Sequence, residues 1–105
     1  MAIREIEFDP EKAQINWQEH KVNFEDAALV FADPLRIERH DDSEGNTSKE
    51  ERWQTLGKVG KILFVIYTER GEKTRIISAR IANKVEKRSY HGHDDNNRKG
   101  WAKAD

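Results

Sequence analysis

The chain has 105 residues, of which 35% are hydrophobic and 37% are charged, and its formal net charge is −1. A chain of this length builds a single domain, and its modest apolar fraction predicts a thin fold with one sheet. The absence of cysteine excludes disulfides and thiolate metal sites. The longest apolar run, Ile62–Tyr67, is far too short to cross a bilayer, and the first residues lack the apolar stretch of a signal peptide. We therefore expect a soluble, cytoplasmic protein.

The small net charge hides a division along the sequence. Residues 1–51 contain 6 Lys and Arg against 14 Asp and Glu, whereas residues 52–105 contain 13 against 6. Such asymmetry is typical of a protein with two differently charged faces, a basic one for phosphates and an acidic one for solvent or a basic partner. On composition alone, an uneven scatter of solvated charges explains it equally well.

The first third of the chain predicts a short strand and two helices. Residues 3–8 alternate apolar and charged side chains, as a half-buried strand does. Asp9 can cap a helix that begins with the proline after it, and we expect this helix to reach about His20. Asn23 can cap a second helix, whose apolar residues form one narrow stripe and which the Asp-Pro pair at 33–34 ends.

The middle of the chain predicts strands joined by short turns. Alternation and β-branched residues place four further strands at residues 35–39, 52–56, 61–69 and 73–80. A polar loop fills residues 40–51, and Gly71 marks a tight turn between the last two strands. The last three strands should therefore form an antiparallel meander.

The end of the chain predicts one more helix and a tail. Asn83 can cap a helix that ends near residue 90, and Glu86 stands at the spacing of a capping box. Residues 92–105 are polar, so we expect a flexible tail there with Trp101 as its only anchor. The whole chain is predicted to be an α+β fold, one domain over 1–91, with an antiparallel sheet of four to five strands and helices packed on one face.

The meander predicts two chemically different sheet faces. If residues 70–71 form the turn, Glu69 lies opposite Glu72 and Tyr67 lies opposite Thr74. The polar members of the resulting mixed face are Arg52, Gln54, Tyr67, Glu69, Thr74, Ser78 and Arg80. Such a face suits a phosphate backbone, although an ordinary solvated face is an equally good interpretation. Arg75 would lie on the other, helix-covered face, near a carboxylate at the sheet's edge.

The first predicted helix carries a second candidate group. Lys12, Asn16 and His20 are spaced by four residues and share one polar stripe, where they can serve as phosphate clamp, positioner and general base or acid. A solvent-facing or interface stripe is the more frequent explanation of this pattern. His91 and His93 form an H-x-H pair, but too few ligands accompany it for a closed metal site. We expect no metal and no cofactor.

Six segments of the chain, in this order, resemble the BrnT family of bacterial toxins, whose fold is related to RelE-type ribonucleases. The segments are FDPEKAQINWQEH at 8–20, VNFEDAALVFADP at 22–34, ERWQTLG at 51–57, YTERG at 67–71, RIISARIA at 75–82 and EKRSY at 86–90. One departure stands out, because the family usually has Lys-His-Gly where this sequence has Glu-His-Lys at 19–21. The departure removes one cation and replaces a conformationally permissive glycine.

The resemblance implies a RelE-like, metal-independent endoribonuclease that uses the RNA 2′-hydroxyl as nucleophile and inhibits translation. Such chemistry needs proton transfer and cations around the phosphate. The residues that the matching motifs then offer are Arg52, Arg75 and Arg80 for phosphate, Glu69 or His20 for proton transfer, Lys12 for positioning and Tyr67 for stacking. Arg70 at the turn, and Thr74 and Ser78 from the mixed face, are candidates for further RNA contacts. The partner implied is a BrnA-like antitoxin, a DNA-binding repressor that silences the toxin in a hetero-oligomer. The alternative function is a non-catalytic RNA-binding or protein-interaction module on the same scaffold.

Overall fold

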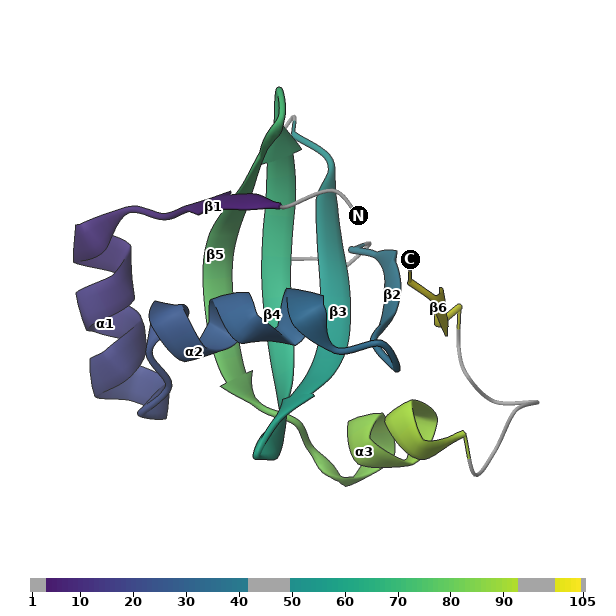
Figure 1. Cartoon of the computed structure of the whole chain (residues 1–105). Coiled ribbons are helices and arrows are strands. Elements are labelled where there is room, and N and C mark those ends of the chain that lie inside the picture. Colours follow the sequence, from purple (N-terminus) through teal and green to yellow (C-terminus); the bar gives the residue numbers. More distant parts are fainter. Residues whose placement is uncertain (1–3, 42–49, 93–99, 105) are drawn as a thin grey trace.

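The computed structural model describes residues 4–41, 50–92 and 100–104. Within them, six strands form one mixed sheet of order β1-β5-β4-β3-β2-β6 (Figure 1). The strands are β1 (Glu5–Glu7), β2 (Ile37–His40), β3 (Arg52–Val59), β4 (Lys61–Arg70), β5 (Lys73–Ile81) and β6 (Ala102–Lys103). The helical segments are α1 (Pro10–His20), α2 (Phe24–Ala28), the 3-10 helix η1 (Leu29–Ala32) and α3 (Lys84–His91). The α+β fold class is confirmed.

The helix boundaries follow from the capping residues that the sequence offers. The Asp9 side chain accepts a hydrogen bond from the Glu11 amide at 2.9 Å, and α1 begins with a proline, as predicted. Asn83 and Glu86 form both hydrogen bonds of the predicted capping box at the start of α3. Among the described residues, no helix is long and apolar enough to cross a membrane.

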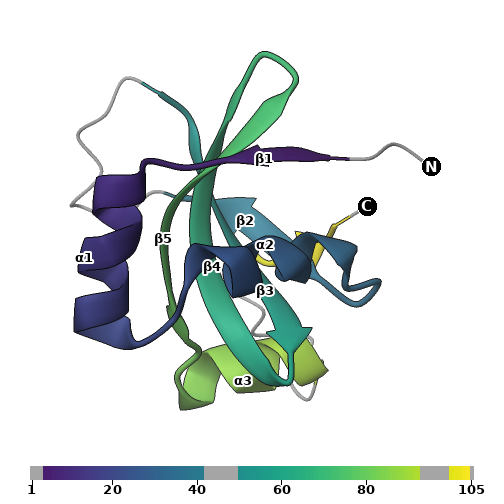
Figure 2. The same ribbon diagram turned by 60° about the vertical axis from the view of Figure 1, so that its left-hand side comes forward.

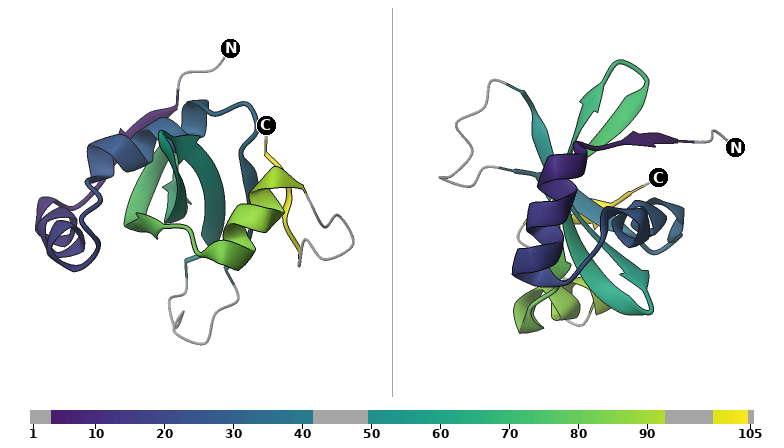
Figure 3. Two further views of the ribbon diagram at one scale, coloured as in Figure 1. Left: turned by 90° about the horizontal axis from the view of Figure 1, so that it is seen from below. Right: turned by 90° about the vertical axis from the view of Figure 1, so that its left-hand side faces the viewer.

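Helices pack on both faces of the sheet. The α1–α2 face is the sheet face that carries Leu63, Val65 and Tyr67, and α1, α2 and η1 cover it. The other face carries Phe64, and α3 covers one end of it (Figure 2). Figure 3 shows the sheet between α2 and α3 when it is viewed along the strands from below. The expected arrangement with all helices on one face is therefore wrong for α3.

The β4–β5 hairpin has a different register from the one that we expected. Its two-residue loop is Gly71-Glu72, and Arg70 pairs with Lys73 across it. Gly71 has φ +61°, which a glycine adopts without steric cost. A bulge then shifts the register beside Ile66. The new turn position keeps Tyr67, Glu69 and Thr74 on one face, but the bulge reverses the alternation and moves Ser78 and Arg80 to the other side of the sheet. The β3–β4 register, with Arg52 opposite Thr68, places Arg52 on that other side as well.

The C-terminal residues extend the sheet. β6 pairs antiparallel with β2, and Trp101 is only 6% exposed, packed edge-on against Phe64. The predicted flexible tail is therefore wrong for residues 100–104, where the expected anchor Trp101 holds the chain in place. The prediction for residues 93–99 lies outside the described residues.

Candidate functional site

The side chain of Asn16 attaches α1 to the edge of β5. Its amide donates hydrogen bonds to the carbonyl oxygens of Val22 at 2.9 Å and Ala79 at 2.8 Å, and its oxygen accepts one from the Ala79 amide at 3.1 Å. β1 pairs only with residues 73–75 of β5, so Asn16 replaces a neighbouring strand farther along that edge. Asn16 is 5% exposed, so its predicted place on a solvent-facing stripe is wrong, although it lines the same pocket as Lys12 and His20.

This attachment brings α1 side chains next to β5. Lys12, His20 and Ser78 line one small pocket of about 150 Å³, although up to 66 residues separate them in sequence. The His20 side chain is 38% exposed, and its Nε2 lies 3.7 Å from a Glu19 carboxylate oxygen. The structure thus brings a lysine, an imidazole and a hydroxyl to the wall of one pocket.

Four arginines share the sheet face opposite α1 and α2, and we call this the arginine face. Its members are Arg39 on β2, Arg52 on β3, and Arg75 and Arg80 on β5. Thr68 lies directly between Arg52 and Arg75, and Phe64 lies directly opposite Arg80. Three of these four arginines come from the basic second half of the chain, which fits the charge division seen in the sequence.

Arg80 is the most firmly held of these side chains. Its two terminal nitrogens donate to the two carboxylate oxygens of Glu86, both at 2.8 Å. Its guanidinium also stacks over the Phe64 ring, 4.1 Å from the ring centroid. Arg80 stands two residues beyond Ser78 on the same strand, about 7 Å along a β-strand, so it lies beside the α1 pocket.

Arg52 differs from the other arginines of this face because its side chain makes no hydrogen bond or ion pair within the described part of the chain. Its side chain is half-buried, and its Nε is a buried donor without a partner. A buried, unpaired donor on a charged group is costly, so it marks a position suited to an anion. In contrast, Arg75 lies 3.8 Å from Glu7, so it pairs with a carboxylate at the sheet's edge as the sequence suggested. Its expected place on the face that the first two helices cover is wrong, because Arg75 lies on the arginine face.

Arg39 and Gln54 form a polar group next to Arg52, in which the sequence predicted Gln54 beside Arg52 but did not mark Arg39. The Arg39 Nε donates to the Gln54 amide oxygen at 2.7 Å, and the Gln54 amide nitrogen donates to Asp41 at 2.8 Å. Arg39 also stacks 4.2 Å from the centroid of the Trp101 ring. Burial lowers the pKa of Arg39, against the opposing charges of Glu86 and Asp41. No local motif marks Arg39, because only the pairing of β2 with β3 brings it to this face.

The predicted mixed face is divided between the two sides of the sheet. Ser78, Arg52 and Arg80 lie on the arginine face, whereas Tyr67, Glu69 and Thr74 lie on the α1–α2 face. Glu69 is near Arg4, 3.6 Å away, and Thr74 accepts a hydrogen bond from Arg4 at 2.9 Å. Arg70 is exposed at the end of the hairpin and pairs with Glu50 at 2.8 Å.

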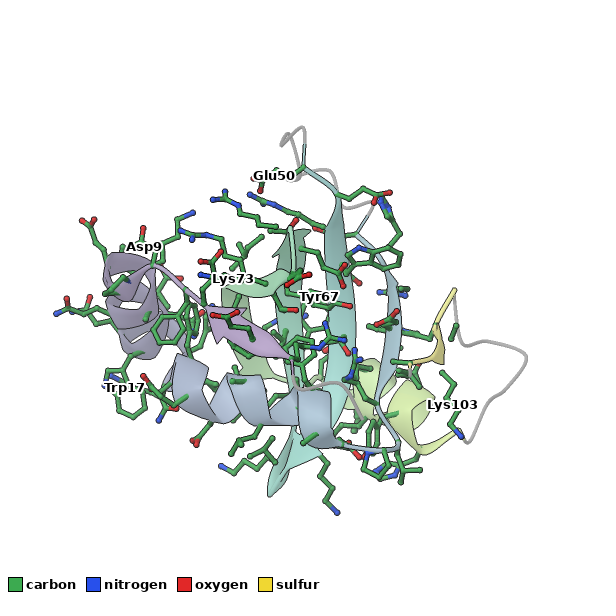
Figure 4. All side chains as sticks on the ribbon, turned by 45° about the horizontal axis from the view of Figure 1, so that its top comes forward. Asp9, Trp17, Glu50, Tyr67, Lys73 and Lys103 are labelled. Carbon is green, nitrogen blue, oxygen red and sulfur yellow. The ribbon has the colours of Figure 1, made fainter. Side chains whose placement is uncertain are left out.

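Tyr67 is buried rather than available for stacking on a base. Its hydroxyl donates to Glu38 at 2.8 Å, and Arg36 donates to the same carboxylate oxygen at 2.9 Å. Burial, followed by the hydrogen bond to Glu38, raises the pKa of Tyr67 to about 12. The ring is 2% exposed and lies at the centre of the sheet in Figure 4.

The largest hollow near Tyr67 is chemically unsuited to a phosphate. This pocket of about 520 Å³ lies on the α1–α2 face. Its charged lining residues are Arg4, Arg36, Glu38, Glu50, Glu51 and Glu69. Four carboxylates against two guanidinium groups disfavour a polyanion. The arginine face is therefore the better candidate for RNA.

Within the described residues, no three His, Asp or Glu side chains are grouped so that they could hold a metal ion. His93, one half of the H-x-H pair, lies outside the described residues. The site built from described residues is thus a row of arginines on one sheet face, with Lys12, His20 and Ser78 at its edge.

The comparisons with known proteins agree with this geometry. A family model described as the ribonuclease toxin BrnT of type II toxin-antitoxin systems matches residues 8–86. The 1.1 Å crystal structure of the Brucella abortus ribonuclease toxin BrnT is similar to this chain, with a TM-score of 0.58 and 25% sequence identity. That similarity covers 78% of this chain and 100% of the Brucella chain. A search of curated proteins gave no match. Since the family model spans well over half of the sequence, the chain belongs to the BrnT family of ribonuclease toxins of type II toxin-antitoxin systems.

Proposed function

We propose that this chain is a metal-independent endoribonuclease toxin that cleaves RNA on the arginine face. The observation that carries the proposal is Arg52, a half-buried guanidinium with an unpartnered Nε on a face with three other arginines. RNA presents one phosphate per nucleotide. Arginines on rigid β-strands can therefore bind single-stranded RNA through its phosphates without reading its sequence. The family description as a ribonuclease toxin supports the same substrate.

The proposed reaction needs no group outside the chain and its RNA. The 2′-hydroxyl loses its proton to a base, and its oxygen forms a bond to the neighbouring phosphorus. The bond from phosphorus to the 5′-oxygen breaks, and that oxygen takes up a proton. Arg80 can pair with the nonbridging oxygens, whose negative charge grows in the transition state.

His20 is our candidate for proton transfer, and Lys12 for stabilising the phosphate. His20 shares a pocket with Ser78, beside Arg80, whereas Glu69 lies on the opposite face of the sheet. An imidazole is suited to this role because its ordinary pKa lies near neutrality. Glu69 and the buried Tyr67 are therefore left out of the proposed site.

We also propose that a BrnA-like antitoxin neutralises the toxin in the cytoplasm. A type II system silences its toxin through a bound protein, and the acidic first half of this chain offers charge complementarity to a basic partner. Expression of the chain should arrest growth, and co-expression of the protein encoded beside it should relieve the arrest.

Cleavage of bulk RNA by the separated toxin is the direct test. Arg80→Ala and His20→Ala should each lower the cleavage rate by about 100-fold or more. Arg4→Ala is the matched control, because it removes the same charge from the opposite face. Activity should persist in EDTA and disappear when the nucleotide before the cleaved bond lacks its 2′-hydroxyl. Persistence without the 2′-hydroxyl would overturn the mechanism.

The same preparations distinguish the enzyme from a binding module. Arg52→Ala should weaken RNA binding and reduce the slope of log affinity against log salt by about 0.7, the value for one lost contact to a single strand. Harmless expression with salt-dependent binding but no cleavage would favour the non-catalytic RNA-binding module.

A further inference from the structure

The contacts of Glu86 point to a role beyond the capping of α3. Its carboxylate holds Arg80 through two parallel hydrogen bonds, both 2.8 Å long. The Glu86 side chain is 10% exposed, while that of Arg80 is 35% exposed. The carboxylate therefore lies beneath the surface, and the guanidinium lies between it and the open face.

Two contacts together fix the plane of the Arg80 guanidinium. Glu86 sets its direction, and the Phe64 ring, 4.1 Å from the guanidinium carbon, supports its flat side. An arginine has five N–H donors, and in Arg80 two are directed at Glu86 and one at the Ile81 carbonyl oxygen at 3.3 Å, so two remain for a phosphate. A clamp that is already oriented loses little side-chain entropy when the RNA binds.

We propose that Glu86 is the positioning residue that orients Arg80 toward the scissile phosphate. This inference rests on the proposed function of the arginine face. Both Glu86 oxygens already accept hydrogen bonds, because Oε1 accepts from Arg80 and from the Asn83 amide while Oε2 accepts from Arg80. Glu86 therefore holds the arginine and does not take the proton of the 2′-hydroxyl. It also connects the start of α3 to the site.

The variant Glu86→Gln separates the two roles of this side chain. Glutamine also completes a capping box, so α3 keeps its cap, but an amide cannot accept from both nitrogens of Arg80. We expect kcat for RNA cleavage to fall by roughly 10- to 100-fold. RNA affinity at low salt should be unchanged or higher, because one negative charge leaves the arginine face.

Two further variants test whether a loss of kcat in Glu86→Gln comes only from a destabilised α3. Asn83→Ala removes the cap but leaves the Glu86–Arg80 pair, so it should lower Tm without lowering kcat at temperatures well below Tm. Arg80→Lys keeps the charge without the planar fork, and adding Glu86→Gln to it should cause little further loss of kcat.

Each outcome decides the proposal. Wild-type kcat in Glu86→Gln, or an equal loss of kcat in Asn83→Ala, would overturn the positioning role while the proposed ribonuclease function stands. Fully additive losses in the double variant would overturn it as well. A wild-type protein that does not cleave RNA would overturn the proposed function, and the positioning role with it.

Discussion

Replacing Asn16 with alanine tests whether one buried amide attaches α1 to the sheet. The side chain makes three hydrogen bonds to the backbone at Val22 and Ala79, with lengths of 2.8 to 3.1 Å. At about 1 kcal/mol each, less about 0.6 kcal/mol for the better helix propensity of alanine, the net loss is about 2.4 kcal/mol. If the backbone groups of Val22 and Ala79 stay buried without a hydrogen-bond partner, the loss can rise to about 4 kcal/mol. That is a large fraction of the roughly 5 to 15 kcal/mol typical of a domain.

Urea denaturation monitored by circular dichroism measures this loss, with Gln14→Ala as the control on the same helix. Gln14 is exposed, so its replacement should change the free energy of unfolding by less than about 0.5 kcal/mol. Asn16→Asp should be at least as harmful as Asn16→Ala, since a carboxylate would face two carbonyl oxygens. Hydrogen exchange at the Ala79 amide should accelerate in both Asn16 variants. If Asn16→Ala lowers the free energy of unfolding no more than Gln14→Ala does, the hydrogen bonds of Asn16 do not hold α1 against the edge of β5.

Three further predictions follow from single contacts. Lys21 ends α1 with φ +57°, a backbone conformation that is strained for any residue with a side chain. Lys21→Gly should therefore raise the free energy of unfolding by about 1 kcal/mol, and an unchanged urea midpoint would show that Lys21 is not strained. Gly57→Ala should lower the free energy of unfolding by about 1 to 3 kcal/mol, because the new Cβ would lie 2.6 Å from the Val30 Cβ. An unchanged free energy of unfolding in urea would show that η1 can move away from β3. Burial, and then the hydrogen bond to Glu38, raise the pKa of Tyr67 to about 12. The neutral hydroxyl therefore stabilises the folded protein below pH 10, and this stabilisation is lost as the pH rises toward 12. Tyr67→Phe should therefore unfold with a flatter alkaline pH dependence than the wild type, and identical profiles above pH 10 would contradict this linkage.

The sequence by itself determined most of the local structure. Capping residues such as Asp9 and Asn83 fixed the starts of α1 and α3, because their side chains satisfy backbone amides that no helical partner can reach. Alternation located the five longer strands to within a few residues, and the glycine at 71 located the hairpin. Lys12, His20, Arg52 and Arg80 were recognised as candidates before the structure placed them.

Only the tertiary structure decided which of these residues lie together. One bulge beside Ile66 reverses the alternation of side chains along β5, so Ser78 and Arg80 lie on the face opposite the one that the turn alone would give them. Tyr67 and Arg80, expected on one face, therefore lie on opposite faces. The contact of Trp101 with Arg39 depends on the long-range pairing of β6 with β2, which no local pattern encodes. The contact of Glu86 with Arg80 spans only six residues, but it depends on how α3 turns back toward the arginine face. The arginine face is thus a product of strand register, and the sequence supplied only its charges.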